Sequence, residues 1–111
     1  MGLGASQARL LMLVARKSDL EYQLQAINQQ RTQIANMVGG LSMTAAASAD
    51  NPNSPQAKGV QMRILGIQQI DKVLEMQAQR INTQHEAVQT EIGAVQKVIQ
   101  KNIQMSFKLM G

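Results

Sequence analysis

The segment Asn51-Pro52-Asn53-Ser54-Pro55 separates two long runs of helical periodicity. Proline has no backbone N–H to donate and its ring clashes with the preceding turn, so Pro52 and Pro55 do not fit a helix interior. The residue before each proline is also driven away from the α region. The sequence therefore predicts two helices joined by one bend.

The first helix is predicted over residues 6–38, because its seam residues recur in steps of three and four. One heptad position is always aliphatic and the other alternates between aliphatic and basic residues: Leu13, Leu20, Ile27, Ile34 and Leu41 occupy the first, and Leu10, Lys17, Leu24, Arg31 and Val38 occupy the second. Ser6 is a candidate N-cap, and Gly39-Gly40 is expected to end the helix in a left-handed cap. Lys17 and Arg31 either extend their charged ends to water or meet acidic residues of a neighbouring chain.

Residues 39–54 are rich in Ser, Ala, Thr and Asn, and this composition predicts a connecting loop. Ser54 followed by Pro55 is a favourable helix start, since serine accepts a hydrogen bond from a free N–H and proline suits the first helical position. Pro52, Ser54 and Pro55 are therefore assigned to the hinge.

The second helix is predicted over residues 55–109, with a central apolar stripe spaced by sevens: Val60, Ile67, Leu74, Ile81, Val88 and Val95. Toward its end, Ile81, Ile92 and Ile103 follow one another at eleven-residue spacing, which favours a nearly straight helix. The expected fold is all-α: a single hairpin of two long antiparallel helices of unequal length, similar to a coiled coil and joined by a Pro-containing loop.

The unequal lengths predict that the hairpin is unfinished. At 1.5 Å per residue the first helix spans roughly 50 Å and the second roughly 80 Å, which leaves roughly 30 Å of the second without an intrachain partner. Each aliphatic side chain gains about 1.5–3 kcal/mol when it is buried. Residues 10–14 are also apolar around most of the helix circumference. The predicted subunit interface comprises Leu10, Leu11, Leu13, Val14, Val88, Ile92, Val95, Ile99, Ile103 and Phe107.

The sequence offers no recognisable chemistry. It has no cysteine, His85 is the single histidine, and Asp71, Glu75, Glu86 and Glu91 are spread along a rod, so neither catalytic residues nor a metal or cofactor site is expected. The net charge is +4, but the basic residues are scattered, so no nucleic-acid partner is expected. No stretch approaches the ~20 apolar residues of a membrane span, so stable membrane insertion is not predicted either.

The hinge resembles the Pro-x-x-Pro turn of type III secretion needle subunits, small cysteine-free helical hairpins whose turn commonly reads Asn-Pro-x-Asp-Pro. Ser54 stands where that family often has Asp, and both residues cap helices. The glutamine-rich, cysteine-free helices are also similar to those of flagellar axial proteins. The resemblance implies export without a cleavable signal peptide, and polymerisation into a hollow helical tube outside the cell or at its surface after synthesis in the cytoplasm. An export apparatus or chaperone would then be a second partner.

We therefore expect a non-enzymatic structural subunit whose main partner is a second copy of itself and whose copies form a helical filament or tube. Two alternatives remain open. In the first, the chain is a soluble coiled-coil adaptor or chaperone that closes into a small bundle with a different protein. A third reading is attachment of the amphipathic residues 1–17 to a membrane surface.

Overall fold

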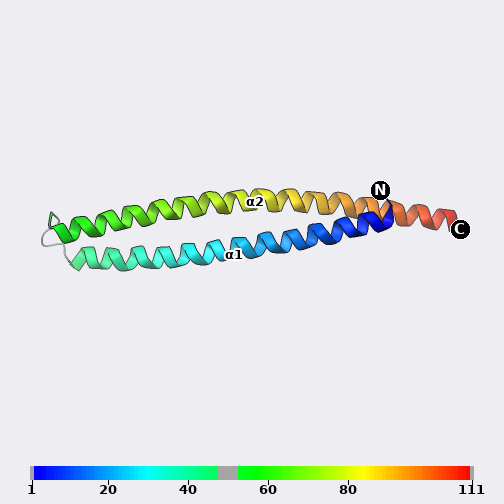
Figure 1. The fold of residues 1–111 in the computed structure, drawn as a ribbon. Helices are drawn as coiled ribbons and strands as arrows, with labels where there is room; N and C mark the ends of the chain where they lie inside the picture. The colour runs from blue at the N-terminus through cyan, green and yellow to red at the C-terminus, as the bar shows by residue number, and fades with distance from the viewer. Residues whose placement is uncertain (1, 48–52, 111) are drawn as a thin grey trace. The chain divides into compact units, whose positions relative to one another are not determined.

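The computed structural model describes residues 2–47 and 53–110, and it contains two helices, α1 (Leu3–Ala47) and α2 (Pro55–Met110) (Figure 1). No strand occurs within these described ranges. The predicted fold class, two long helices of unequal length joined by a Pro-containing loop, is confirmed.

Interactions of neighbouring residues determine where α2 begins. The Ser54 hydroxyl accepts a hydrogen bond from the Ala57 backbone N–H at 3.1 Å, and Pro55 is the first helical residue. Serine thus satisfies one of the N–H groups that a helix start leaves free. The predicted helix start at Ser54 and Pro55 is confirmed, whereas Pro52 lies outside the described residues.

α1 is longer than predicted at both ends. It continues through Gly39-Gly40 to Ala47, and neither glycine adopts a positive φ, so the predicted helix end at residue 38 is wrong. Leu41 and Ala45 continue the heptad of half-buried positions beyond the glycines. Their packing outweighs the cost of about 1 kcal/mol that each glycine imposes on a helix.

Ser6 lies inside α1 rather than at its N-cap, and its backbone N–H donates to the Gly2 carbonyl at 2.9 Å. Its side chain is completely buried, and its Oγ has no hydrogen-bond partner within the described part of the chain. Ser6 stands seven residues before Leu13, so the heptad extends one repeat farther toward the N-terminus than its apolar members indicate.

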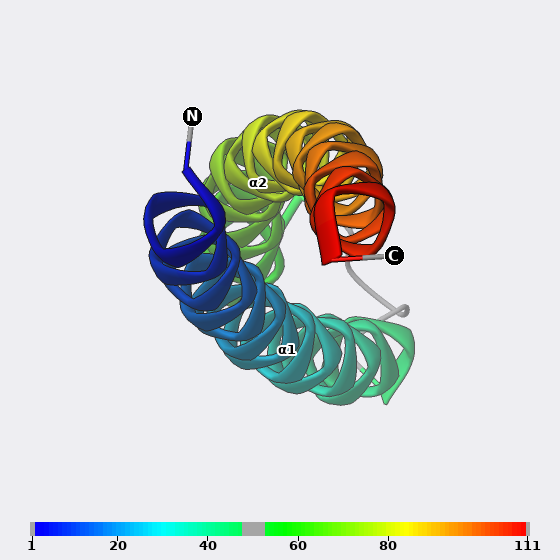
Figure 2. The ribbon, with the colours of Figure 1, turned by 90° about the vertical axis from the view of Figure 1, so that its right-hand side faces the viewer.

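The chain divides into two compact units, and each unit contains one segment of α1 and one segment of α2. The terminal unit contains residues 1–24 and 80–111, and the bend unit contains residues 25–79. In the terminal unit Leu13, Leu20, Ile81, Val88 and Val95 are buried between the two helices, and in the bend unit Ile27, Ala57 and Ala78 are buried. Figure 1 superposes the two segments of the terminal unit, and Figure 2, turned by 90°, separates them as neighbouring helices.

The seam on α2 follows a regular heptad throughout. Apart from Gly93, its buried and half-buried positions alternate steps of three and four from Ala57 to Asn102. Asn102 is half-buried whereas Ile103 is 44% exposed, so the eleven-residue spacing to Ile103 does not describe the packed face. A repeat of 3.5 residues keeps one face of a helix against its neighbour over many turns.

The prediction that roughly 30 Å of the second helix has no intrachain partner is also wrong. Val88 and Val95 are 6% and 9% exposed within the terminal unit, and Leu3 lines a groove together with Ile103 and Phe107. In the terminal unit the half-buried positions of α2 continue to Asn102, and residues 103–109 are exposed.

Candidate interaction surfaces

The ten predicted interface residues fall into three groups. Leu13, Val88 and Val95 are buried between α1 and α2, and Leu10, Ile92 and Ile99 are half-buried along the same seam. The exposed members are Leu11 (72%), Val14 (45%), Ile103 (44%) and Phe107 (77%). The reason given for Val88, Ile92, Val95 and Ile99, that they have no intrachain partner, does not hold. Only the exposed group is free to contact another chain without unfolding the hairpin.

A second apolar surface lies on α2 in the bend unit, and the sequence prediction missed it. Met62, Leu65, Val73 and Met76 are 74%, 60%, 54% and 62% exposed. Viewed down the helix axis, at about 100° per residue, these four residues lie within an arc of about 80°. This arc is roughly opposite Asp71, which lies in the seam. We call these four residues the outer stripe. α2 is therefore apolar on two opposite faces in this unit, which one neighbouring helix cannot cover.

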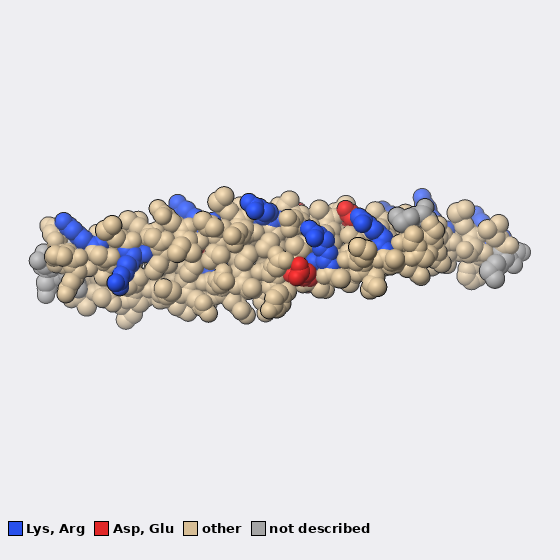
Figure 3. All heavy atoms as spheres, viewed as in Figure 1, with Lys and Arg blue, Asp and Glu red and all other residues tan. Residues whose placement is uncertain are grey.

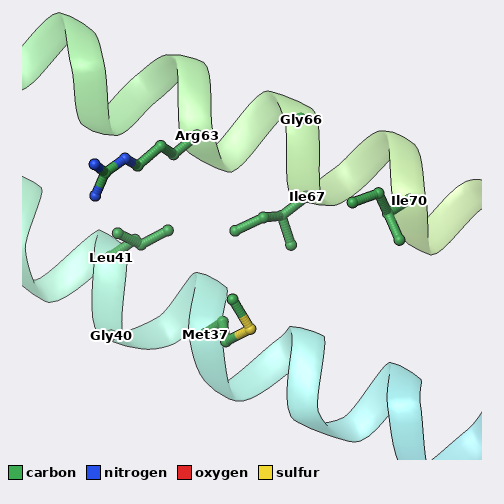
Figure 4. Close-up of a pocket in the computed structure, with 7 residues that line it drawn as sticks. All are labelled: Met37, Gly40, Leu41, Arg63, Gly66, Ile67 and Ile70. Carbon is green, nitrogen blue, oxygen red and sulfur yellow. The ribbon is translucent and has the colours of Figure 1, made fainter.

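The bend unit also contains an apolar groove of about 550 Å³ between α1 and α2 (Figure 4). Its lining comprises Met37, Gly40, Leu41, Arg63, Gly66, Ile67 and Ile70. Gly40 and Gly66 come from opposite helices, and no atom lies within 4 Å of the place where either would carry a Cβ. Both glycines are exposed, and each precedes a seam residue of its own helix, Leu41 or Ile67.

The terminal unit has a smaller groove of about 350 Å³, lined by Leu3, Ile103, Ser106 and Phe107. Beyond it Met105 and Leu109 are 61% and 86% exposed. The C-terminal end of α2 is thus apolar and largely uncovered by α1.

One charged pair crosses the seam in the bend unit. Arg31 donates from Nε and Nη2 to the two carboxylate oxygens of Asp71, at 2.9 and 3.3 Å, and both side chains are about one-third exposed. The hydrogen bonds from Arg31 lower the pKa of Asp71, and the same bonds raise the pKa of Arg31. Arg31 thus meets an acid of its own chain, which neither alternative considered from the sequence included.

A second polar group lies in the terminal unit. The His85 Nε2 and Glu21 Oε1 atoms are 3.1 Å apart, and Lys17 Nζ lies 3.9 Å from the same carboxylate oxygen. Nearer the N-terminus, Arg9 Nη2 donates to Glu91 Oε2 at 2.8 Å, with both side chains about half exposed. Exposed pairs of this kind contribute little to stability, but they fix which residues face each other.

The remaining charges form no obvious ligand site. On the face shown in Figure 3, lysine and arginine side chains are scattered among uncharged residues, with few acidic ones between them. Among the described residues, no three potential metal ligands gather in one place. Neither described helix has a stretch both long and apolar enough to cross a membrane.

Comparisons with known protein families, characterised proteins and solved structures find no match to this chain. The interaction surfaces described above are therefore the basis for a functional assignment.

Proposed function

We propose that this protein is a structural subunit whose copies assemble into a helical filament or hollow tube. The observation that carries the proposal is the uncovered surface. The chain exposes 8411 Å², whereas a compact protein of its 12.1 kDa mass exposes about 6,000 Å². A standard interface buries about 800 Å² on each partner. The difference of roughly 2,400 Å² leaves room for several such contacts.

The exposed apolar residues support contacts between copies of the chain. The outer stripe lies in the bend unit, whereas Leu11, Val14 and Phe107 belong to the terminal unit. A two-fold dimer uses one self-complementary surface on each copy. Repeated contacts between different patches cover both, and such heterologous contacts form rings or open helical filaments.

The surface composition is compatible with close packing of identical chains. The net charge of +4 is small for 111 residues, and much of the polar surface is glutamine, which adds no charge. Copies of such a chain therefore repel one another only weakly at physiological ionic strength.

Light scattering coupled to size-exclusion chromatography, followed by negative-stain microscopy, tests the proposal. We expect the mean mass to grow with protein concentration and filaments to appear. A fixed dimer or tetramer at all concentrations would favour the coiled-coil adaptor, and a persistent monomer would refute self-assembly.

A charge in the outer stripe provides a sharper test. Leu65→Lys should reduce assembly while the helical circular dichroism signal is retained, because Leu65 is 60% exposed and contributes little to the hairpin seam. Gln61→Lys adds the same charge at an exposed position of the same helix outside the stripe and serves as the control. Equal assembly of the two variants would remove the outer stripe from the interface.

The resemblance of the hinge to needle subunits extends the proposal to export by a type III-like or flagellar-type system. The expected outcome is that the chain accumulates outside intact cells and that disabling the secretion apparatus abolishes this. Retention of all the protein in the cytoplasm of an assembling strain would refute export without affecting self-assembly.

A further inference from the structure

The methionine side chains that the structure describes all lie on the solvent side of the hairpin. Six of the eight methionines have described side chains, and these are between 54% and 76% exposed: Met12, Met37, Met43, Met62, Met76 and Met105. Methionine is one of the residue types most often buried, and its flexible thioether commonly fills gaps in cores. Here the buried apolar residues of the described part are Leu, Ile, Val and Ala. The six thioether sulfurs are therefore accessible to reagents in the solvent.

The outer stripe contains two of these methionines, Met62 and Met76. They lie on α2 in the bend unit, are 74% and 62% exposed, and make up half of the four stripe residues. The buried seam of the same unit is formed by other residues, among them Ile27, Ala57 and Ala78. A chemical change confined to the two methionines therefore alters the stripe and leaves the seam between α1 and α2 as it is.

A peroxide oxidises the thioether of an accessible methionine. One oxygen atom of hydrogen peroxide forms a bond to the sulfur, the O–O bond breaks, and the other oxygen leaves as water with both hydrogens. The sulfur gives up two electrons and becomes a sulfoxide, and the peroxide is reduced. The sulfoxide is polar, so it favours water over an apolar contact. Methionine sulfoxide reductases return it to the thioether, and a dithiol that supplies the two electrons becomes a disulfide as water is released.

We propose that Met62 and Met76 are oxidation sites through which a peroxide controls assembly, because their sulfoxides make the outer stripe polar and keep free subunits from joining. The inference rests on the self-assembly proposed above and adds a chemical regulation of its surface. The hairpin seam does not include these two residues, so the oxidised subunit stays folded. Reduction of the sulfoxides restores the apolar stripe and, with it, assembly.

The two sulfurs are accessible in the free subunit and shielded in the assembled one. Both side chains are more than half exposed in the single chain, whereas a neighbouring copy seated on the outer stripe covers them. When free and assembled protein receive the same amount of hydrogen peroxide, peptide mass spectrometry should find slower oxidation of Met62 and Met76 in the assembled sample. Equal rates in the two samples would overturn the proposal.

The stability of the oxidised hairpin separates a surface effect from unfolding. Urea unfolding is followed by circular dichroism below the concentration of assembly, before and after complete oxidation. We expect the two midpoints to agree closely, because the oxidised side chains lie outside the seam. A marked fall in the midpoint would show that oxidation unfolds the hairpin, and it would overturn control through the surface.

Matched double variants identify the sites. Oxidation of the unmodified chain should raise the protein concentration needed for assembly by ~10-fold or more, since two methionines lose most of what their burial contributes. Leucine keeps a similar apolar volume without sulfur, so Met62→Leu/Met76→Leu should assemble equally well with and without peroxide. Met12→Leu/Met43→Leu removes two exposed methionines outside the stripe and should remain as sensitive as the unmodified chain. Equal sensitivity of the two double variants would contradict the assignment.

The outcomes separate the two proposals. If the unmodified chain stays monomeric at all concentrations, self-assembly fails and its control by oxidation fails with it. If the unmodified chain assembles and its fully oxidised form assembles equally well, self-assembly stands and control by oxidation is refuted. If oxidation blocks assembly, treatment with the reductases and a dithiol should restore it, and continued failure to assemble after mass spectrometry shows intact thioethers would refute the role of the two methionines.

Discussion

Replacing Val95 by aspartate tests whether this residue is buried in the hairpin seam or lies on the surface that contacts other copies. From the sequence, Val95 belongs to an uncovered overhang, and Val95→Asp should abolish assembly while leaving a soluble helical chain. In the structure Val95 is 9% exposed and packs between the helices of the terminal unit. The structural expectation is therefore different: the substitution should destabilise the hairpin itself.

The magnitude follows from two contributions. Loss of a buried valine costs about 1.5 kcal/mol, the lower end of the range for aliphatic side chains. Placing a carboxyl group without a partner in the same site costs about 1–3 kcal/mol more. We expect the free energy of unfolding to fall by about 2.5–4.5 kcal/mol, a large part of the ~5–15 kcal/mol that typical domains possess.

Val98→Asp is the matched control, since Val98 lies three residues away on the same helix and is 36% exposed. Its expected cost is below about 1 kcal/mol, as for most surface substitutions. Urea unfolding followed by circular dichroism, at concentrations below assembly, measures both values. Equal midpoints for the two variants would show that Val95 is not buried in the seam in solution and would restore the overhang.

Two further substitutions test polar groups in the seam. Because the Arg31 hydrogen bonds lower the pKa of Asp71 in the folded state, the stabilisation they provide is present above the unfolded pKa of about 4 and is lost as pH falls through the folded value. Asp71→Asn should therefore flatten the fall in stability below about pH 4, and an unchanged profile would contradict the pairing. Ser6→Ala removes a buried hydroxyl that has no partner and introduces a better helix former, so the urea midpoint should stay constant or rise, by up to about 1 kcal/mol. A clear fall in the midpoint would show that the hydroxyl has a stabilising partner.

The fold could be predicted wherever a local interaction decides it. Ser54 and Pro55 start α2 through a cap and a fixed φ, and both act within one turn of helix. The end of α1 was mispredicted because Gly39-Gly40 is a local signal and the continuing heptad through Leu41 is a tertiary one. Helix propensities differ by about 1 kcal/mol at most for glycine, so packing along a seam readily overrides them.

The interaction surfaces were harder to predict because they depend on which residues of α1 face which residues of α2. Phe107 and Leu11 are exposed, as an interface requires, and both were selected from hydrophobicity alone. The groove is lined by residues of both helices, and nothing near Leu41 in the sequence indicates Arg63 or Ile67. Asp71 had a usable signal: it occupies the heptad position between Ile64 and Ala78, where an acid is unexpected unless a base faces it.

The Arg31–Asp71 pair favours one register of the two helices within the bend unit. Two heptad stripes can slide past each other by seven residues and still bring aliphatic side chains together. In the bend unit such a slip would place Arg31 opposite Ile64 or Ala78 instead of Asp71, leaving two half-buried charges without partners. In the terminal unit the same slip would move Arg9 from Glu91 to Gln84 or Val98. The cost of separating Arg31 from Asp71 therefore opposes such a slip within the bend unit.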